Sequence, residues 1–395
     1  MRKPNCSNVI SEKKIWEIGI EFIRCVDKKL VEYNLVLAYI VYLLCKESKF
    51  SYKITKKMIF ASCFNDIGKL SASSKKSTPE IETYLFLKYF SPVKDFAEII
   101  INPKKNKYAK TLYFAKKYTT FLVEQNDAMQ AYACLDRRDY DYKIFELQGK
   151  ILKKYDVKQE LNSVHYKTIV YSLISKMMFK QSESAELITM LSSLFEMYSS
   201  QTLFHSKTCA YIAYYLSLKM RQGREENAKV YVAGLCHDLG KVKVPRTILE
   251  KDGRLTDDEF KIMKSHVIYT RELLNHRAEF DIIEMASRHH EKIDGSGYPN
   301  KLDGDHMTQS QKIIQVADLI SALTGKRSYK EAWTVDDVVK ELTYCVNHNT
   351  IDKDVVNCFI KHKKKIMNIS NMILNEAKKV YDKIDNERNM LIKKD

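Results

Sequence analysis

The residues best suited to chemistry lie between His205 and Lys330. Five histidines and two aspartates in this stretch are candidate metal ligands: His205, His237, Asp238, His266, His289, His290 and Asp318. Imidazole and carboxylate ligands without paired cysteines suit iron, manganese, nickel or zinc. Seven ligands are too many for one tetrahedral zinc ion, whereas two ions that share a bridging carboxylate would use them all.

Two metal ions about 3.5–4 Å apart lower the pKa of a bridging water and also hold a phosphate oxygen, which is the chemistry of phosphodiester cleavage. Lys241 follows His237 by four positions and Asp238 by three, so a helix would place all three on one face. An ammonium group there would contact the scissile phosphate or the leaving oxygen. The alternative is an ordinary lysine near the C-terminus of a helix, beside Gly240.

A glycine-rich segment follows the histidine pair, with Gly295, Gly297 and Gly304 in a chain that has only 11 glycines. Glycine permits positive φ angles and a close approach of the backbone to a ligand. An ordinary surface loop is the alternative, but the adjacent histidines favour a loop that shapes the site.

These blocks resemble the HD-GYP family, the bacterial phosphodiesterases that open cyclic di-GMP and related cyclic dinucleotides. The matching segments are residues 237–241, 244–249, 253–256, 264–266, 289–299, 316–318 and 322–330. The resemblance covers about residues 186–363 and implies an all-α helical bundle of the HD superfamily.

The resemblance implies that all seven candidate ligands bind metal and that Asp238 bridges two divalent ions, with iron or manganese expected. Lys241 would act at the scissile phosphate, and Tyr298 would lie on the substrate side of the signature loop. Arg327 and Lys330, one helical turn apart, would hold the phosphates of the substrate.

Two positions depart from the family pattern. Members with a third metal have a glutamate four residues before the first histidine, where this chain has the neutral Gln201, so we expect two ions. Lys243 replaces a small residue and is expected to add charge near the site.

The implied reaction is hydrolysis of cyclic di-GMP by attack of a metal-bridging hydroxide on the phosphodiester. The hybrid 3',3'-cyclic GMP-AMP is an alternative substrate. A cyclic-dinucleotide receptor or scaffold with little turnover is an alternative of another class, although a binding protein has no physical reason to keep a complete ligand set.

The first 152 residues have long amphipathic stretches typical of α-helices. One constant shift along the chain aligns residues 38–44 with 210–216 and residues 65–69 with 237–241. The same shift places Tyr33 opposite His205 and Asn65 opposite His237. A less certain match, at a different offset, places residues 114–116 opposite 316–318 and so Lys116 opposite Asp318. Of the core set, only Asp66 and Lys69 remain. We therefore expect a degenerate HD-like domain without metal ligands, whose role is packing, dimerisation or ligand sensing.

The predicted organisation has four segments. A degenerate HD-like domain (1–152) is followed by a helical linker (153–185), an HD-GYP catalytic domain (186–363) and a charged C-terminal helix (364–395). The last helix is expected to be amphipathic, with apolar residues at Ile366, Ile369, Met372, Ile373 and Ala377. It would pack on its own domain or form a contact with a partner, including a homodimer.

Composition excludes several other classes of protein. The formal net charge is +16, but acidic residues are interspersed with the basic ones and no nucleic-acid-binding motif is present, so no nucleic-acid polymer is expected as partner. Nine isolated cysteines indicate a reducing compartment, and we expect a cytoplasmic protein. The longest apolar run, residues 35–45, is too short to span a bilayer, so no membrane insertion is expected.

Overall fold

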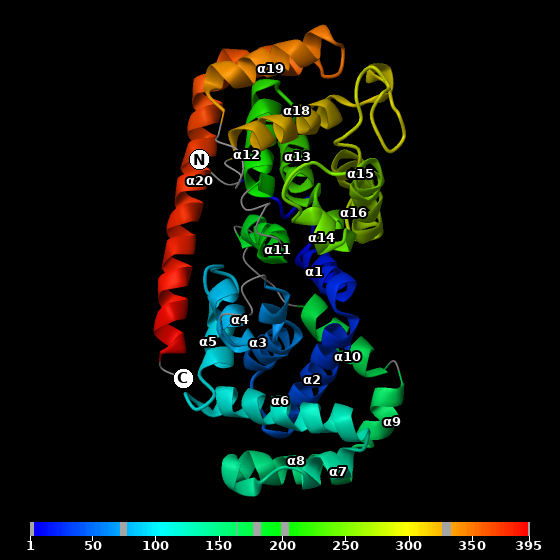
Figure 1. Cartoon of the computed structure of the whole chain (residues 1–395). Helices are drawn as coiled ribbons and strands as arrows, with labels where there is room; N and C mark the ends of the chain where they lie inside the picture. Colours follow the sequence, from blue (N-terminus) through cyan, green and yellow to red (C-terminus); the bar gives the residue numbers. More distant parts are fainter. Residues whose placement is uncertain are drawn as a thin grey trace. The chain divides into compact units, whose positions relative to one another are not determined.

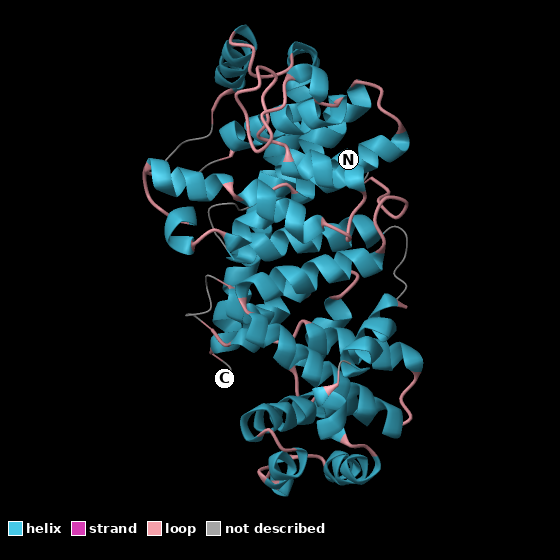
Figure 2. Cartoon of the chain, turned by 90° about the vertical axis from the view of Figure 1, so that its right-hand side faces the viewer, coloured by secondary structure: helices cyan, strands magenta, loops and turns pink. Residues whose placement is uncertain are grey.

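The computed structural model describes residues 4–71, 77–163, 165–176, 183–198, 205–325 and 333–393. Within these residues every regular element is a helix, and the only β contact is an isolated bridge between Asp294 and Asp303 (Figure 2). The prediction of an all-α protein is confirmed.

The helices form two compact units (Figure 1). The histidine-rich unit contains residues 1–22 and 180–387, and the Asp66 unit contains residues 23–179 and 388–395. The boundaries fall inside the helices α1 (Glu12–Val26) and α20 (Lys353–Ile392). The predicted division placed residues 1–22 in the first domain, whereas here they group with the histidine-rich unit.

The Asp66 unit is built around α2 (Lys28–Glu47), which contains the apolar run at residues 35–45 and packs against α3, α6, α8 and α10. Asp27 begins this helix, because its side chain accepts a hydrogen bond from the Leu30 amide. The other helices of this unit are α3 (Tyr52–Cys63), η1 (Ile67–Leu70), α4 (Pro79–Leu87), α5 (Lys94–Ile101), α6 (Lys107–Gln125), α7 (Ala128–Ala133), η2 (Arg137–Asp139), α8 (Tyr142–Lys154), α9 (Val157–Asn162) and α10 (His165–Ser175).

The segment predicted as a helical linker, 153–185, contains α9 and α10. Since α10 packs against α2 and α3, it belongs to the body of the Asp66 unit and is not a free connection.

The histidine-rich unit has a core of α12, α13, α17 and α18, in which α12 packs against both α13 and α18. Its helices after α1 are α11 (Ser184–Tyr198), α12 (His205–Lys219), α13 (Arg224–Cys236), η5 (Leu239–Lys243), α14 (Arg246–Leu249), α15 (Asp257–Lys264), α16 (His266–Leu274), α17 (Phe280–Ser287), η6 (Gly304–His306), α18 (Gln309–Thr324), α19 (Val335–Asn347) and α20.

Two glycines let the elements that carry candidate ligands approach closely. A Cβ atom on Gly234 of α13 would lie 2.7 Å from the Cα atom of Ala210 on α12. A Cβ atom on Gly240 would overlap the backbone of α16 at the His266 carbonyl oxygen and the Thr270 amide. Helix α13 therefore meets α12, and η5 meets α16, at distances that a side chain would prevent.

The predicted C-terminal helix is the second part of the single helix α20. Ile366, Ile369, Ile373 and Ala377 are buried, as the amphipathic pattern predicts, whereas Met372 is 41% exposed. The hydroxyl of Ser370 donates a hydrogen bond to Thr324 Oγ1 over 3.2 Å, which links α20 to the end of α18.

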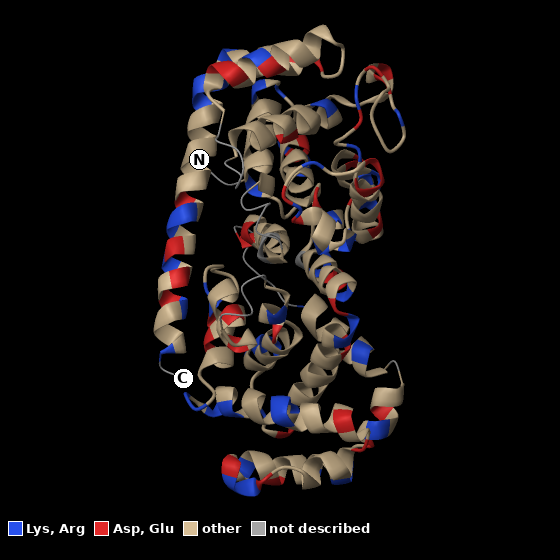
Figure 3. Cartoon of the chain, in the orientation of Figure 1, with Lys and Arg blue, Asp and Glu red and all other residues tan. Residues whose placement is uncertain are grey.

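Basic and acidic side chains are interspersed along the helices, as Figure 3 shows clearly on α20. Among the described helices, none combines the length and the apolar composition that crossing a bilayer requires.

The fit around Gly240 leads to a stability prediction. Gly240→Ala should lower the free energy of unfolding by at least about 1–3 kcal/mol, because the new methyl group must displace backbone of α16. Gly223→Ala is the matched control, since its Cβ atom would meet nothing within 4 Å. Chemical denaturation of both variants measures the difference, and equal stability would contradict the close crossing.

Candidate metal centre

Three candidate ligands take their orientation from the ends of helices. The Nδ1 atoms of His237, His266 and His289 lie 2.8, 2.7 and 2.8 Å from the carbonyl oxygens of Gly234, Met263 and Ala286, respectively. These carbonyls lie in the last turns of α13, α15 and α17, where the helix supplies no further donor. Since a carbonyl only accepts, each Nδ1 carries a proton, and Nε2 is the ring nitrogen left to face a metal ion.

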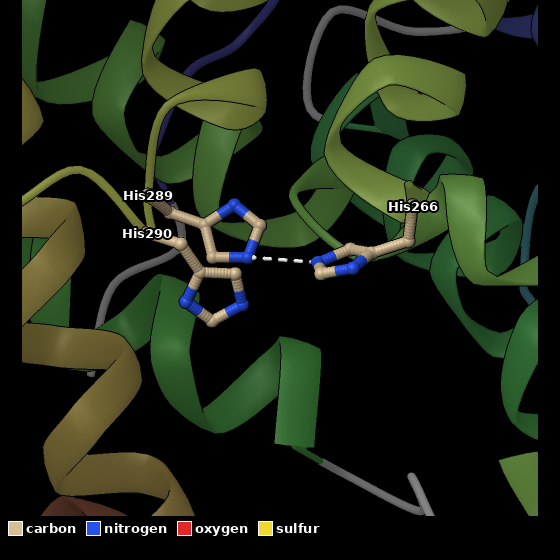
Figure 4. Close-up of side chains that lie close together, drawn as sticks. All are labelled: His266, His289 and His290. Atoms are coloured by element: carbon tan, nitrogen blue, oxygen red, sulfur yellow. Dashed lines mark hydrogen bonds between the residues drawn. The ribbon is translucent and has the colours of Figure 1, made fainter. Parts of the chain in front are cut away.

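The Nε2 atoms form two neighbouring clusters. His266 Nε2 lies 3.3 Å from His289 Nε2, and the ring of His290 completes this group (Figure 4). His237 Nε2 lies 3.2 Å from His205 Nε2 in the second group. Histidines from four separate segments therefore converge on a small volume.

The carboxylate of Asp238 lies between the two clusters. Its Oδ1 atom is 3.6 Å from His266 Nε2 and 3.9 Å from His289 Nε2. Its Oδ2 atom is 3.4 Å from His237 Nε2 and 3.6 Å from His205 Nε2. Each oxygen thus faces one cluster, which is the arrangement of a carboxylate that bridges two cations.

Asp318 on α18 joins the second cluster. Its Oδ1 atom lies 3.0 Å from His205 Nε2 and 3.6 Å from His237 Nε2. Ser321, one turn later, holds His205 through a 3.0 Å contact to Nδ1 and donates its own proton to the Asp318 carbonyl. Sequence reasoning missed Ser321, although its spacing of three from Asp318 places both on one helix face.

The donor set fits divalent cations. Asp238 is 1% exposed, and its Oδ1 atom has no hydrogen-bond partner among the described residues. A buried carboxylate oxygen without a donor is costly unless a positive charge lies beside it. The seven predicted ligands are thus brought together around an atom that needs a cation. Their ligation of metal stays a prediction.

Burial controls the protonation of the first cluster. It lowers the pKa of His266 to about 3, and the charge of Lys241 acts in the same direction. It lowers the pKa of His290 to about 4, although Asp318 opposes this shift. The pKa of His289 is also well below its usual range through burial and its histidine neighbours. All three imidazoles are neutral at pH 7, the form that binds metal.

The carboxylates control the second cluster. Burial alone would lower the pKa of His237, but Asp238 and Asp318 outweigh it and raise the pKa to about 10. Burial likewise opposes the charge of Asp238, yet His237, Lys241 and His205 hold the pKa of that carboxyl well below its usual range. The carboxylates that attract a proton here attract a metal cation equally well.

Cys209 is a further group near the second cluster, beside His237 and Asp318. It was not predicted, although it follows His205 by one helical turn. Burial, with the charges of Asp318 and Asp238, raises the pKa of this thiol well above its usual range. Cys209 is fully buried on α12 and packs in the core of this unit.

Lys241 lies beside Asp238, and its predicted role at the scissile phosphate stays a prediction. Its Nζ atom is 2.6 Å from Asp238 Oδ2, and its side chain is 18% exposed. Lys243 was expected to add positive charge near the site. Its ammonium instead lies 2.7 Å from Glu272 Oε2, and the negative charge of this glutamate offsets it.

Comparisons with known proteins agree with this geometry. Residues 186–355 match the family model of the HD domain. This stretch of the chain is therefore similar to HD domains. The predicted resemblance is thereby confirmed for the histidine-rich half, whereas nothing in the comparisons tests the degenerate repeat in the first half.

Curated relatives of the HD domain are cyclic-dinucleotide phosphodiesterases. The chain is 34% identical to 3'3'-cGAMP-specific phosphodiesterase 2 of Vibrio cholerae over 51% of its own length and 38% of the relative's. It is 29% identical to the cyclic di-GMP phosphodiesterase response regulator RpfG of Xanthomonas campestris pv. campestris, over 57% and 60% of the two lengths. The chain thus spans less than two thirds of the length of each of these two relatives.

A solved structure shares the fold of most of the chain. The crystal structure of the cyclic GMP-AMP-specific phosphodiesterase V-cGAP3 of V. cholerae superimposes with a TM-score of 0.55, over 89% of this chain and 97% of that one. The sequence identity is 15%, so this likeness concerns the fold alone.

The glycine-rich loop of the HD domain folds back over the first cluster. The Tyr298 amide donates to the His290 carbonyl over 3.1 Å, and the two rings lie 4.8 Å apart. Gly297 is required for this fold, because a Cβ atom there would overlap the backbone of Glu291 and Lys292. Tyr298 is mainly buried beside His290, in keeping with the predicted place of this loop at the site.

Glu291 holds this loop in place and was not singled out from the sequence. Its side chain is fully buried, and its carboxylate accepts the amide protons of Asn300 and Leu302 over 2.5 and 2.9 Å. Gln315 on α18 also donates to the Glu291 carbonyl over 2.6 Å. The acid next to the histidine pair in the sequence was the available signal.

Three predicted positions lie outside the described residues: Gln201, Arg327 and Lys330. The expectations of two ions rather than three and of a phosphate clamp therefore stay predictions.

The role of Glu291 can be tested by hydrogen exchange. Glu291→Ala should speed amide exchange at Asn300 and Leu302 and cost about 1–3 kcal/mol of stability, because both amides lose their acceptor. Glu291→Gln keeps one acceptor oxygen and should give an intermediate effect. Asp305→Ala, at an exposed position of the same loop, is the control. Unchanged exchange at residues 300 and 302 would contradict this role.

Proposed function

We propose that the protein is a metal-dependent phosphodiesterase that hydrolyses a cyclic dinucleotide. The observation that carries this proposal is Asp238, whose two carboxylate oxygens each face a separate histidine cluster. The match to the HD domain and the relatives that act on cyclic dinucleotides support the same reaction class.

Two divalent ions, which we propose to be iron or manganese, would be held by the seven candidate ligands, with Asp238 between them. When bound, they would supply a hydroxide nucleophile and charge stabilisation at the phosphate. The neutral imidazoles of His266 and His289 keep their Nε2 lone pairs directed inward through the helix-end carbonyls, so little reorganisation accompanies binding. This preorganisation also favours metal over a proton on the first cluster.

Lys241 is proposed to contact the scissile phosphate. Its ammonium already lies beside Asp238 Oδ2, and partial exposure leaves it accessible to a substrate. Positive charge at this position stabilises the negative charge that develops on the phosphate oxygens in the transition state. Tyr298 would border the substrate from the loop, and Arg327 with Lys330 would hold its phosphates.

Cyclic di-GMP is the proposed substrate, and 3',3'-cyclic GMP-AMP is the second candidate. Relatives named for each of these substrates match the chain at similar identity. Anaerobically purified protein should linearise one or both in a panel that also contains cyclic di-AMP. Metal-replete protein that binds these dinucleotides without turnover would instead support a receptor.

Metal content provides a separate prediction. The full chain, purified without oxygen, should hold close to two iron or manganese ions, and Asp238→Ala should lower this content and abolish turnover because it removes the bridge. Asp66→Ala in the other unit is the control and should change neither. Elemental analysis with activity assays distinguishes the outcomes, and full activity of metal-free protein would refute the mechanism.

The proposed phosphate clamp predicts a split between kinetic constants. Arg327→Ala should chiefly raise KM for the cyclic dinucleotide, because its partner phosphate is held in both the ground state and the transition state. Arg224→Ala, an exposed arginine at the start of α13, is the control. An unchanged KM would remove Arg327 from the substrate site.

A further inference from the structure

The turn at Asp66 is built like the turn at Asp238. The Gly68 amide donates to Thr83 Oγ1 over 2.9 Å, as the Gly240 amide donates to Thr270 Oγ1 over 2.9 Å. A Cβ atom on Gly68 would overlap the backbone of the next helix, as at Gly240. The backbones differ at the aspartate itself, where φ is +58° at Asp66 and −100° at Asp238.

A lysine ammonium occupies the place beside Asp66 where the histidine-rich unit has imidazoles. Lys116 Nζ lies 2.7 Å from Asp66 Oδ1 and also pairs with Glu80. Burial opposes the charge of Lys116, but Asp66 and Glu80 hold its pKa above the usual value. This buried carboxylate therefore has its cation from the chain itself and needs no metal.

Tyr33, aligned with His205, supports the same conclusion. Its hydroxyl donates to the Lys116 carbonyl over 3.0 Å, and burial raises the pKa of Tyr33. A neutral phenol is a poor ligand for a divalent ion. Tyr33 thus fixes the helix that carries Lys116 and does not offer a metal ligand.

A cavity of about 270 Å³ lies beside this ion pair, within the Asp66 unit. Its apolar wall includes Ile81, Ile100 and Leu112. Its polar lining comprises Asn65, Thr78, Tyr113, Lys116, Lys117 and the carboxylate of Glu80, which pairs with Lys116. Asn65 is 1% exposed, and its Nδ2 atom has no hydrogen-bond partner among the described residues. A buried amide donor of this kind needs an acceptor, since leaving it unpaired costs free energy.

We propose that this cavity binds a small organic anion of at most mononucleotide size. The anionic oxygens would accept a hydrogen bond from Asn65 Nδ2 and lie near the ammonium of Lys117. The apolar part of the ligand would contact the apolar wall. Lys116 and Lys69 offset the negative charges of Asp66 and Glu80. The additional ammonium of Lys117 therefore makes the net charge around the cavity positive.

The size of the cavity limits the ligand. Pockets for drug-sized ligands are about 300–1,000 Å³, so this one lies below the lower end. A cyclic dinucleotide is too large for it, whereas a monophosphate or a carboxylate with an apolar body is suitable. The cavity would therefore make the Asp66 unit a sensor of a small metabolite, distinct from the proposed hydrolytic site.

The test uses the full chain with Asp238→Ala, so that the metal centre does not contribute a second anion site. Calorimetric titration with GMP, AMP, benzoate and inorganic phosphate should show saturable binding of at least one organic probe, with about one molecule per chain. Adding Asn65→Ala or Lys117→Met should weaken that binding about tenfold, since each removes one strong polar contact. Lys53→Met, an exposed lysine on α3 away from the cavity lining, should leave it unchanged.

Several results would overturn the assignment. These are no saturable binding of any probe at millimolar concentration, equal affinity for inorganic phosphate and the organic probes, or binding that Asn65→Ala and Lys117→Met leave unchanged. Lys117 is exposed, so its substitution tests the site even where Asn65→Ala perturbs folding. Hydrolysis by protein with native Asp238 is measured separately, so failure of the cavity and failure of the phosphodiesterase proposal are distinguishable.

Discussion

A buried carboxylate that requires cations on both of its oxygens is the constraint around which the histidine-rich unit is arranged. Asp238 is 1% exposed, and Oδ1 has no donor within the described part of the chain. Such a group is tolerated only where positive charge surrounds it. Lys241 supplies part of that charge at Oδ2, and the two histidine clusters are positioned to hold the rest as metal ions.

The ends of short helices give this site its precision. A histidine placed just after α13, α15 or α17 satisfies a last-turn carbonyl through Nδ1 and so directs Nε2 inward. One contact therefore completes the helix end and selects the ligating tautomer. Because the orienting groups are backbone atoms, the geometry depends on helix length and crossing, for which Gly234 and Gly240 provide the room.

The two units solve the same electrostatic problem in different ways. At Asp66, the ammonium of Lys116 meets the carboxylate directly, and burial keeps Tyr33 neutral. At Asp238, Lys241 supplies positive charge only at Oδ2, while Oδ1 faces the neutral imidazoles of His266 and His289 and has no cation from the described residues. The duplicated origin of the first unit stays a prediction, but the matching Gly–Thr hydrogen bonds agree with it.

The sequence by itself determined the all-α class, the HD domain and a set of candidate ligands, because adjacent pairs such as His237-Asp238 and the glycine-rich loop are local patterns. The face that each ligand presents was decided only by the tertiary structure. Three features depend on contacts between helices that are far apart in the chain. They are the orientation of Asp238 with one oxygen toward each histidine cluster, the hydrogen bonds of Glu291 to the loop, and the contact of Ser321 with His205. The same holds for Lys116, whose alignment with Asp318 was the least clear part of the repeat, and for the cavity beside Asn65. These features arise from long-range packing, and residue spacing within one helix carries no information about which distant helix it will meet.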